Sequence, residues 1–224
     1  MGEHRKLKKR DIYLNKLIAF QGTEPVKVIT GIRRCGKSSL LKLMQEHLLH
    51  SGVKQEQIIA INFESLEFQE MSYKDLYAYV KKKISKNQRT YLFFDELQRI
   101  HQWENAINSF RVDFNCDIYI TGSNSYLLSS EYSTYLAGRY IEVKMYPLSF
   151  KEFIDFHGYI LKDYQTPIGE TKKRAWKENG EIAETRDLLD AYMRYGGMPG
   201  IADFGLEQDR VMTVLDLSLI HISE

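Results

Sequence analysis

The chain has 224 residues, of which 43% are hydrophobic and 27% charged, as in an ordinary globular protein with one full α/β domain and part of another. Its formal net charge of +1 excludes a strong attraction of the whole molecule to nucleic acid or membrane, so such a contact would need a local patch. Two cysteines are too few for a disulfide framework, and no apolar run is long enough to cross a bilayer, so a cytoplasmic protein is expected.

The chain begins with a local basic patch, residues 5–10, which contains five Lys or Arg residues. Such a run has two interpretations: the solvated flank of a first helix, or an arm that contacts nucleic acid. Apolar periodicity predicts that helix over residues 12–20.

A phosphate-binding loop follows the first predicted strand, residues 26–30. Residues 31–38 match the pattern G-x-x-x-x-G-K-[ST] and lead into a helical run, residues 39–50. In such a loop the backbone N–H groups and the helix N-terminus bind phosphates, while Lys37 and the Ser38 hydroxyl reach phosphate and Mg²⁺. A lysine at a helix start is otherwise unfavourable, because the helix dipole repels cations there. The predicted nucleotide-binding residues are Gly31, Ile32, Arg33, Arg34, Cys35, Gly36, Lys37, Ser38 and Ser39.

Two acids follow a later apolar strand. Residues 91–94 are large and apolar, which is typical of a strand buried on both faces, and Asp95 and Glu96 come directly after them. At the carboxyl edge of a parallel sheet, Asp95 would join Ser38 in holding Mg²⁺, and Glu96 would orient or deprotonate the attacking water. The alternative is that both acids cap the next helix. A Glu directly after the metal-binding Asp favours hydrolysis over transfer to a small acceptor.

A third predicted strand, residues 117–121, runs into small polar side chains. Ser123 and Asn124 there are candidates for contacting the γ-phosphate or the attacking water, with an ordinary Gly-Ser-Asn turn as the alternative. Between the strands, two helices present aromatic faces that we interpret as core packing: Tyr73, Leu76, Tyr77, Val80 and Ile84 on one, and Trp103, Ile107, Phe110 and Phe114 on the other.

Five strand candidates alternate with helices, which predicts parallel strands joined by right-handed crossovers. The other two are residues 58–62 and 140–145. Three regions are expected: an ATPase-like core with its N-terminal helix over residues 1–158, a polar connector over 159–186 with a partly exposed helix, and a helical region over 187–224. The last region contains a strong helix stop at residues 196–200.

Several of these segments together resemble the prokaryotic AAA-type ATPases of the AAA_14 family, whose longer members carry a C-terminal DUF4143 region. The segments are residues 28–38, 94–100, 103–104, 121–125, 137–139, 146–153 and 195–199. The resemblance implies a three-layer α/β/α P-loop fold whose five-stranded, mainly parallel sheet has the order 5-1-4-3-2. It also implies roles for Lys37, Asp95 and Glu96 in ATP hydrolysis.

The resemblance also singles out Arg139, as part of a Gly-Arg pair. Three roles are open for it: sensing the γ-phosphate in cis, acting as a finger toward a neighbouring subunit, or forming an internal ion pair. Family members run well past the Gly-Gly-x-Pro segment, and residues 217–224 look like translated adapter sequence, so a C-terminally truncated reading frame is expected.

Three functions are compatible with these features. The first is an ATPase that uses Mg²⁺ and couples to an unknown partner or C-terminal effector region, or to self-association. The second is a nucleotide-operated switch with little turnover. The third is a DNA-associated motor or nuclease accessory, suggested by the basic start and by family analogy.

Overall fold

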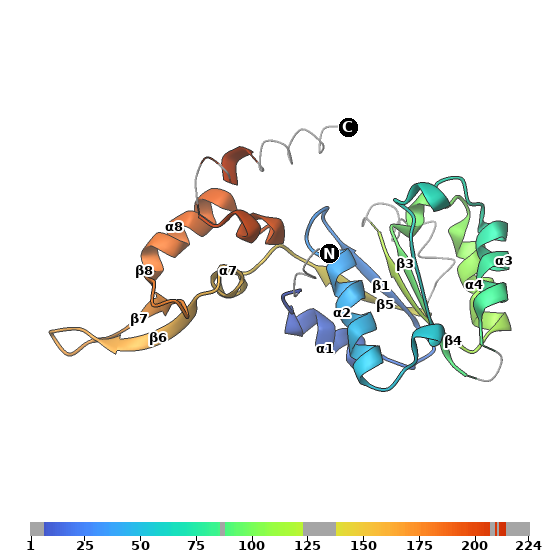
Figure 1. Cartoon of the computed structure of the whole chain (residues 1–224), viewed down its shortest axis with the longest axis horizontal. Coiled ribbons are helices and arrows are strands. Elements are labelled where there is room, and N and C mark those ends of the chain that lie inside the picture. Colours follow the sequence, from blue (N-terminus) through green and yellow to red (C-terminus); the bar gives the residue numbers. More distant parts are fainter. Residues whose placement is uncertain (1–6, 86–87, 123–137, 207–208, 210, 214–224) are drawn as a thin grey trace. The chain divides into compact units, whose positions relative to one another are not determined.

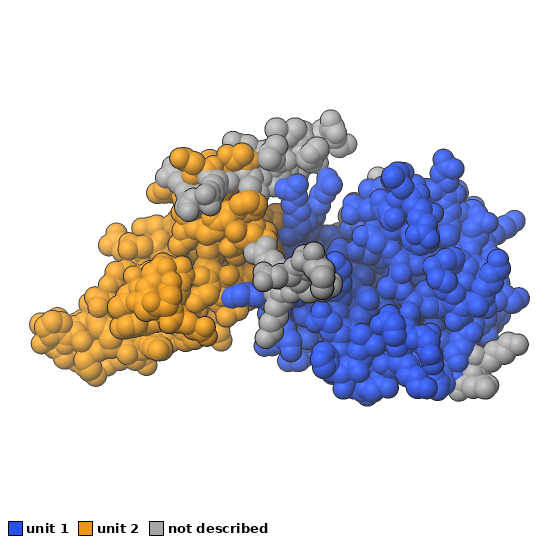
Figure 2. All heavy atoms as spheres, viewed as in Figure 1, with its two compact units in different colours: residues 1–145 blue, residues 146–224 orange. Residues whose placement is uncertain are grey.

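The computed structural model describes residues 7–85, 88–122, 138–206, 209 and 211–213. The chain divides into two compact units, Met1–Met145 and Tyr146–Glu224 (Figure 2). The division comes earlier than the end of the predicted core at residue 158. Among the described residues, no helix combines the length and the apolar character that crossing a membrane requires.

The first unit is built on a parallel five-stranded sheet (Figure 1). Its strands lie in the order β2-β3-β4-β1-β5, and every neighbouring pair is parallel, which confirms the predicted order. The strands are β1 (Val26–Gly31), β2 (Ile58–Asn62), β3 (Thr90–Asp95), β4 (Cys116–Thr121) and β5 (Tyr140–Met145). We call the side where these strands begin the amino edge, and the side where they end the carboxyl edge.

Helices cover the sheet on both faces. Helices α1 (Asp11–Ala19) and α2 (Lys37–His50) pack on one face, and α3 (Tyr73–Lys83) and α4 (Trp103–Asp113) on the other (Figure 1). Short 3-10 turns fall at Gln55–Gln57, Leu66–Phe68 and Leu97–Arg99. The aromatic faces of α3 and α4 pack into the core, as predicted, and α4 buries Trp103 and Phe110 completely or nearly so. Two apolar layers therefore hold the sheet rigid between them.

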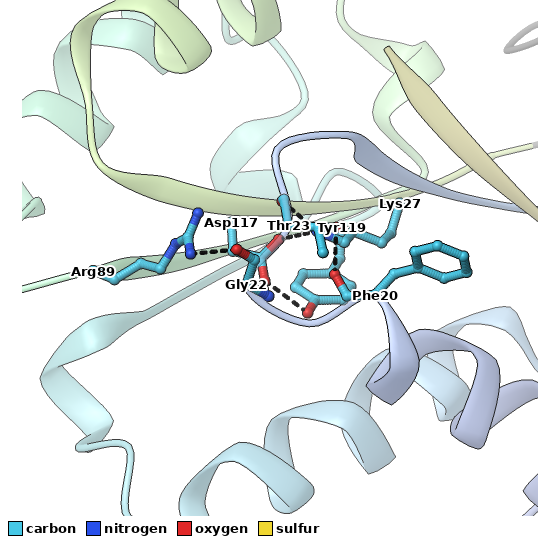
Figure 3. Close-up of polar contacts among 7 residues, drawn as sticks. All are labelled: Phe20, Gly22, Thr23, Lys27, Arg89, Asp117 and Tyr119. Carbon is cyan, nitrogen blue, oxygen red and sulfur yellow. Dashed lines mark hydrogen bonds and ion pairs between the residues drawn. The ribbon is translucent and has the colours of Figure 1, made fainter. Parts of the chain in front are cut away.

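A buried polar network closes the amino edge (Figure 3). Lys27 of β1 lies 2.5 Å from an Asp117 oxygen of β4, and both side chains are 0% exposed. The second Asp117 oxygen accepts hydrogen bonds from the Gly22 N–H at 2.7 Å and the Tyr119 hydroxyl at 3.0 Å. Arg89, just before β3, donates to the Gly22 carbonyl at 2.5 Å. Charged and polar groups thus join β1, β4, the residue before β3 and the turn after α1.

The second unit contains an antiparallel sheet where the sequence predicts a partly exposed helix and connectors. Its strands are β6 (Ile160–Gln165), β7 (Thr171–Trp176) and β8 (Ile182–Glu184), in the order β6-β7-β8. The prediction of a partly exposed helix within the polar connector, residues 159–186, is therefore wrong up to the end of β8 at Glu184. The unit also contains α7 (Phe150–Phe156), α8 (Thr185–Tyr195) and a 3-10 helix at Pro199–Phe204.

The prediction failed because the many polar residues of these strands obscure the alternation between core-facing and outward-facing side chains. Leu161, Ala175 and Ala183 lie opposite one another on adjacent strands and pack in a small core with Ile154 and Leu188. Their neighbours along each strand face the other way and include the cross-strand ion pair between Arg174 and Glu184, so the segment looks like a solvated helix.

The Gly-Gly-x-Pro segment after α8 has a packing role as well as ending the helix. The Gly197 carbonyl accepts from the Leu148 N–H at 2.6 Å, and the Tyr192 hydroxyl donates to the Leu148 carbonyl at 2.8 Å. A Cβ atom at Gly197 would lie 2.4 Å from that carbonyl oxygen, closer than any side chain can approach. Residues 146–153 and 195–199, two of the segments that carry the family resemblance, are therefore in contact within this unit.

Candidate nucleotide-binding site

The phosphate-loop segment leaves the carboxyl edge of β1 and enters α2. Gly31 has φ of +148°, and a Cβ there would lie 2.5 Å from the Met145 carbonyl of β5 and 2.8 Å from the Cys35 sulfur. Gly36 has φ of +99° and is the N-cap of α2, which begins at Lys37, two residues before the predicted start. Glycine is required at both places because other residues would clash or be strained. The positive end of a 14-residue helix thus follows directly on the loop.

Lys37 points back into the loop. Its ammonium donates to the carbonyls of Gly31 and Ile32, each at 3.2 Å, and lies 3.9 Å from a carboxylate oxygen of Glu96. Ser38 and Ser39 are half-buried in the first turn of α2, and Ile32, Arg33 and Arg34 are exposed at the tip of the loop. Of the predicted residues, Lys37 and Glu96 are therefore brought together from segments far apart in sequence.

Cys35 faces inward from the loop and is fully buried. Burial raises the pKa of its thiol, although the nearby Lys37 and Arg10 charges act in the opposite direction. The side chain therefore remains a neutral thiol that packs against the sheet. The Cys35 backbone N–H donates to the Ile32 carbonyl at 3.4 Å within the loop.

Asp95 and Glu96 end β3 beside the last residue of β4, Thr121. The Thr121 hydroxyl donates to Asp95 at 2.5 Å and accepts from the Glu96 N–H at 3.0 Å. One side chain thus fixes the Asp95 carboxylate and the backbone of Glu96 together. This arrangement differs from simple helix capping, because neither acid is the N-cap of α4, which is Gln102, and Glu96 precedes only a 3-10 turn.

Arg139, the remaining predicted residue that the structure describes, is not brought to this edge. Ser123 and Asn124 lie outside the described residues. Arg139 is exposed at the amino edge, where its carbonyl accepts from the Val26 N–H at 2.9 Å. Strand β1 separates it from the loop, and at about 3.3 Å per residue the two lie roughly 15 Å apart. Its guanidinium forms no ion pair with any residue that the structure describes.

Arg10 is a residue of this site that the sequence did not reveal. The basic patch led us to expect a solvated flank or a nucleic-acid arm, but Arg10 is 5% exposed and donates to the Cys35 carbonyl at 3.2 Å. Its guanidinium also stacks over the Tyr13 ring, 4.6 Å from the centroid. For this residue the prediction was wrong, because a run of cations does not show which one the tertiary fold buries.

The donor set fits Mg²⁺ held jointly with phosphate oxygens. Among the described residues, no group of three or more His, Cys, Asp or Glu is arranged to hold a metal alone. Mg²⁺ usually takes one or two protein oxygens together with water and phosphate oxygens. The nearly buried Asp95 carboxylate and the Ser38 hydroxyl at the start of α2 are oxygen ligands of that kind.

Comparison with known proteins agrees with this geometry. Residues 23–154 match the model of the AAA_14 family, described as an AAA domain. The chain belongs to this family. An uncharacterized protein of Haemophilus influenzae is 37% identical over 216 residues, which cover 95% of this chain and 49% of that protein. An uncharacterized protein of Methanocaldococcus jannaschii is 32% identical over 177 residues, which cover 79% of this chain and 36% of that protein.

A solved structure, the Walker-type ATPase of Pyrococcus abyssi, has the same fold as this AAA_14 chain. It aligns with a TM-score of 0.59 at 19% identity and covers 96% of this chain and 74% of that one. The AAA_14 chain spans about half the length or less of the curated relatives it matches.

Proposed function

We propose that this AAA_14 protein binds ATP and hydrolyses it to ADP and phosphate with the help of Mg²⁺. The observation that carries the proposal is the meeting of three groups at the carboxyl edge. Lys37 lies 3.9 Å from Glu96, and Thr121 joins Glu96 to Asp95. The reaction requires a cation that binds phosphate, a carboxylate that binds the metal, and a base. In this proposal the three groups lie together at the start of one helix.

Each residue has a distinct role in this proposal. The loop N–H groups and Lys37 bind the phosphates and offset their negative charge, and Lys37 would exchange its loop carbonyls for phosphate oxygens. Ser38 and Asp95 would hold Mg²⁺, which supplies charge neutralisation at the phosphates. Glu96 accepts the proton of the attacking water, with one carboxylate oxygen facing the Lys37 side of the site.

The test is steady-state ATP hydrolysis by the 224-residue chain with and without Mg²⁺, together with an independent ATP-binding assay. Lys37→Ala should lose both binding and turnover. Glu96→Gln should keep binding and lose turnover by about 10²- to 10⁴-fold, the usual contribution of a general base. Arg99→Ala, which removes an exposed side chain close to the site, is the matched control. Binding without turnover in the unchanged chain would favour a nucleotide-operated switch, and no binding would refute the proposal.

Coupling of hydrolysis to a protein partner or to a further region is part of the same proposal, supported by curated relatives at least twice as long as the aligned part. ATP-dependent co-purification, compared between the unchanged chain and Glu96→Gln, tests it. A DNA-associated role has less support, because Arg10 of the basic patch is buried. DNA binding that weakens steeply with salt would restore it.

A further inference from the structure

We propose that Gln98 is a positioning residue that holds Glu96 in the orientation needed to accept a proton from water. The inference rests on the proposed ATP hydrolysis and assigns a task to a residue two positions after the predicted base. It depends on the backbone of the turn that carries both residues, on the contact between their side chains, and on the unpaired atom of Gln98.

The turn that carries Glu96 and Gln98 has little freedom. Glu96 has φ of +57° and ψ of +45°, the left-handed region that a residue with a Cβ rarely adopts. It is held there by the hydrogen bond from its N–H to Thr121 and by Leu97 and Ile100, which precede and follow the Gln98–Arg99 pair and whose side chains are buried in the core. Because those anchors fix the backbone of the turn, the side chain of Gln98 extends from one fixed position beside Glu96.

The side-chain contact selects one oxygen of the Glu96 carboxylate. The Gln98 amide nitrogen donates to Glu96 Oε2 at 2.5 Å, while Oε1 is the oxygen 3.9 Å from the Lys37 ammonium. One oxygen is therefore held on the protein side, and the other is presented toward the phosphate loop. Without the amide, the carboxylate of this half-buried side chain could rotate away, because no other side-chain hydrogen bond to it is found among the described residues and the Lys37 ammonium lies 3.9 Å away.

Only the nitrogen end of the Gln98 amide forms a hydrogen bond among the described residues. A carboxylate can only accept, so the amide nitrogen must face Glu96 and the amide oxygen must face away. That oxygen is buried and has no hydrogen-bond partner among the residues the structure describes. A glutamine retained only for stability would be expected to pair both ends. The one-sided pairing therefore indicates that the contact with Glu96 determines where the side chain lies.

Two substitutions separate positioning from simple packing. Gln98→Leu removes the donor at similar volume, and Gln98→Glu keeps the shape but places a second carboxylate against Glu96. For Gln98→Leu, kcat should fall by about 10- to 100-fold, the usual effect of misplacing a reacting group, with ATP affinity within twofold of the unchanged chain. Arg99→Ala, in the same turn but exposed, should leave kcat and affinity unchanged.

The pH profile supplies a second readout that a merely structural role would not affect. At pH 8 the introduced carboxylate of Gln98→Glu repels Glu96, so kcat should fall at least as far as in Gln98→Leu. As the pH is lowered, the introduced group takes up a proton and regains an O–H donor, so the ratio of its kcat to that of the unchanged chain should rise. The same ratio for Gln98→Leu should not rise.

The outcomes distinguish this inference from the proposed function. If the unchanged chain turns over ATP and Glu96→Gln does not, but both Gln98 variants match the unchanged chain, only the role of Gln98 is refuted. A loss of ATP affinity equal to the loss of kcat, or a flat pH ratio for a folded Gln98→Glu variant, would also refute it. If the unchanged chain has no turnover at all, the proposed function and this inference are refuted together.

Discussion

The two edges of the five-stranded sheet use the same kinds of residue in opposite ways. At the amino edge, Lys27 and Asp117 meet at 2.5 Å with both side chains 0% exposed. At the carboxyl edge, Lys37 and Glu96 are 3.9 Å apart, and the Glu96 side chain is 22% exposed. A lysine and an acid therefore form a closed pair at one edge and a loose one at the other.

The closed pair is bonded within the protein and shielded from any ligand. Both Asp117 oxygens have protein donors, and the Lys27 ammonium also donates to the Thr23 carbonyl (Figure 3). Burial lowers the pKa of Lys27, and the hydrogen bond and charge of Asp117 oppose that shift. At the carboxyl edge, by contrast, the partners of Lys37 among the residues that the structure describes are two loop carbonyls and Glu96 at 3.9 Å, so phosphate can replace them. How completely a charge is paired therefore separates a structural site from a binding site.

The largest expected effect is on stability at the amino edge. Lys27→Met leaves the Asp117 carboxylate buried without its cation, so the free energy of unfolding should fall by about 3–5 kcal/mol. Urea denaturation followed by circular dichroism measures it. The double variant Lys27→Met with Asp117→Leu should lose less than the single one, because no unpaired charge remains. A single variant as stable as the unchanged chain would show that the pair is not structural.

A smaller effect on stability is expected at Thr121, a residue that we assign to both stability and turnover. Thr121→Val keeps the shape but removes the donor to Asp95 and the acceptor for the Glu96 N–H. We expect a loss of about 1–3 kcal/mol in the free energy of unfolding, because buried polar groups lose their partner. Turnover should fall in the same variant. Thr121→Ser, which keeps the hydroxyl, is the control, and equal behaviour of the two variants would contradict the assignment.

The same substitution at the other lysine should have the smallest effect on stability. Lys37→Met removes no close ion pair but two hydrogen bonds to loop carbonyls, so the free energy of unfolding should fall by about 1–2 kcal/mol. ATP binding, measured by calorimetry, should nevertheless be lost. If Lys37→Met and Lys27→Met destabilise the chain equally, the contrast between the two edges is wrong.

Thiol labelling tests both edges without changing stability. Burial raises the pKa of Cys116, at the start of β4, to about 12, and burial also raises the pKa of Cys35 in the loop. Because the thiolate is the reactive form, both should resist an aromatic disulfide reagent at pH 8 in the folded chain and react promptly in urea. Rapid labelling of Cys35 in the folded chain would show that the loop opens.

Much of the first unit could be predicted because its signals are local. The Gly31 to Ser38 pattern, the apolar run before Asp95 and the alternation of strands with helices predicted the fold, and the family resemblance predicted the strand order. The second unit was harder, because the residues of β6 and β7 that face the small core are few and are surrounded by charged neighbours. In that segment the polar residues suggested a partly exposed helix, but pairing between strands determined the structure.

A glycine pattern, a lysine and two acids could be singled out from the sequence as the candidate site residues, because this combination favours the same chemistry wherever it occurs. How these residues are held depends on the folded chain. The tertiary structure buried Arg10 beneath the loop, joined Asp95 and Glu96 through Thr121, placed Gln98 against Glu96, and left Arg139 at the opposite edge. Most of these contacts join residues on different elements, and the contact between Gln98 and Glu96 is set by a left-handed turn. A linear pattern records neither the distance between such side chains nor the direction in which they point.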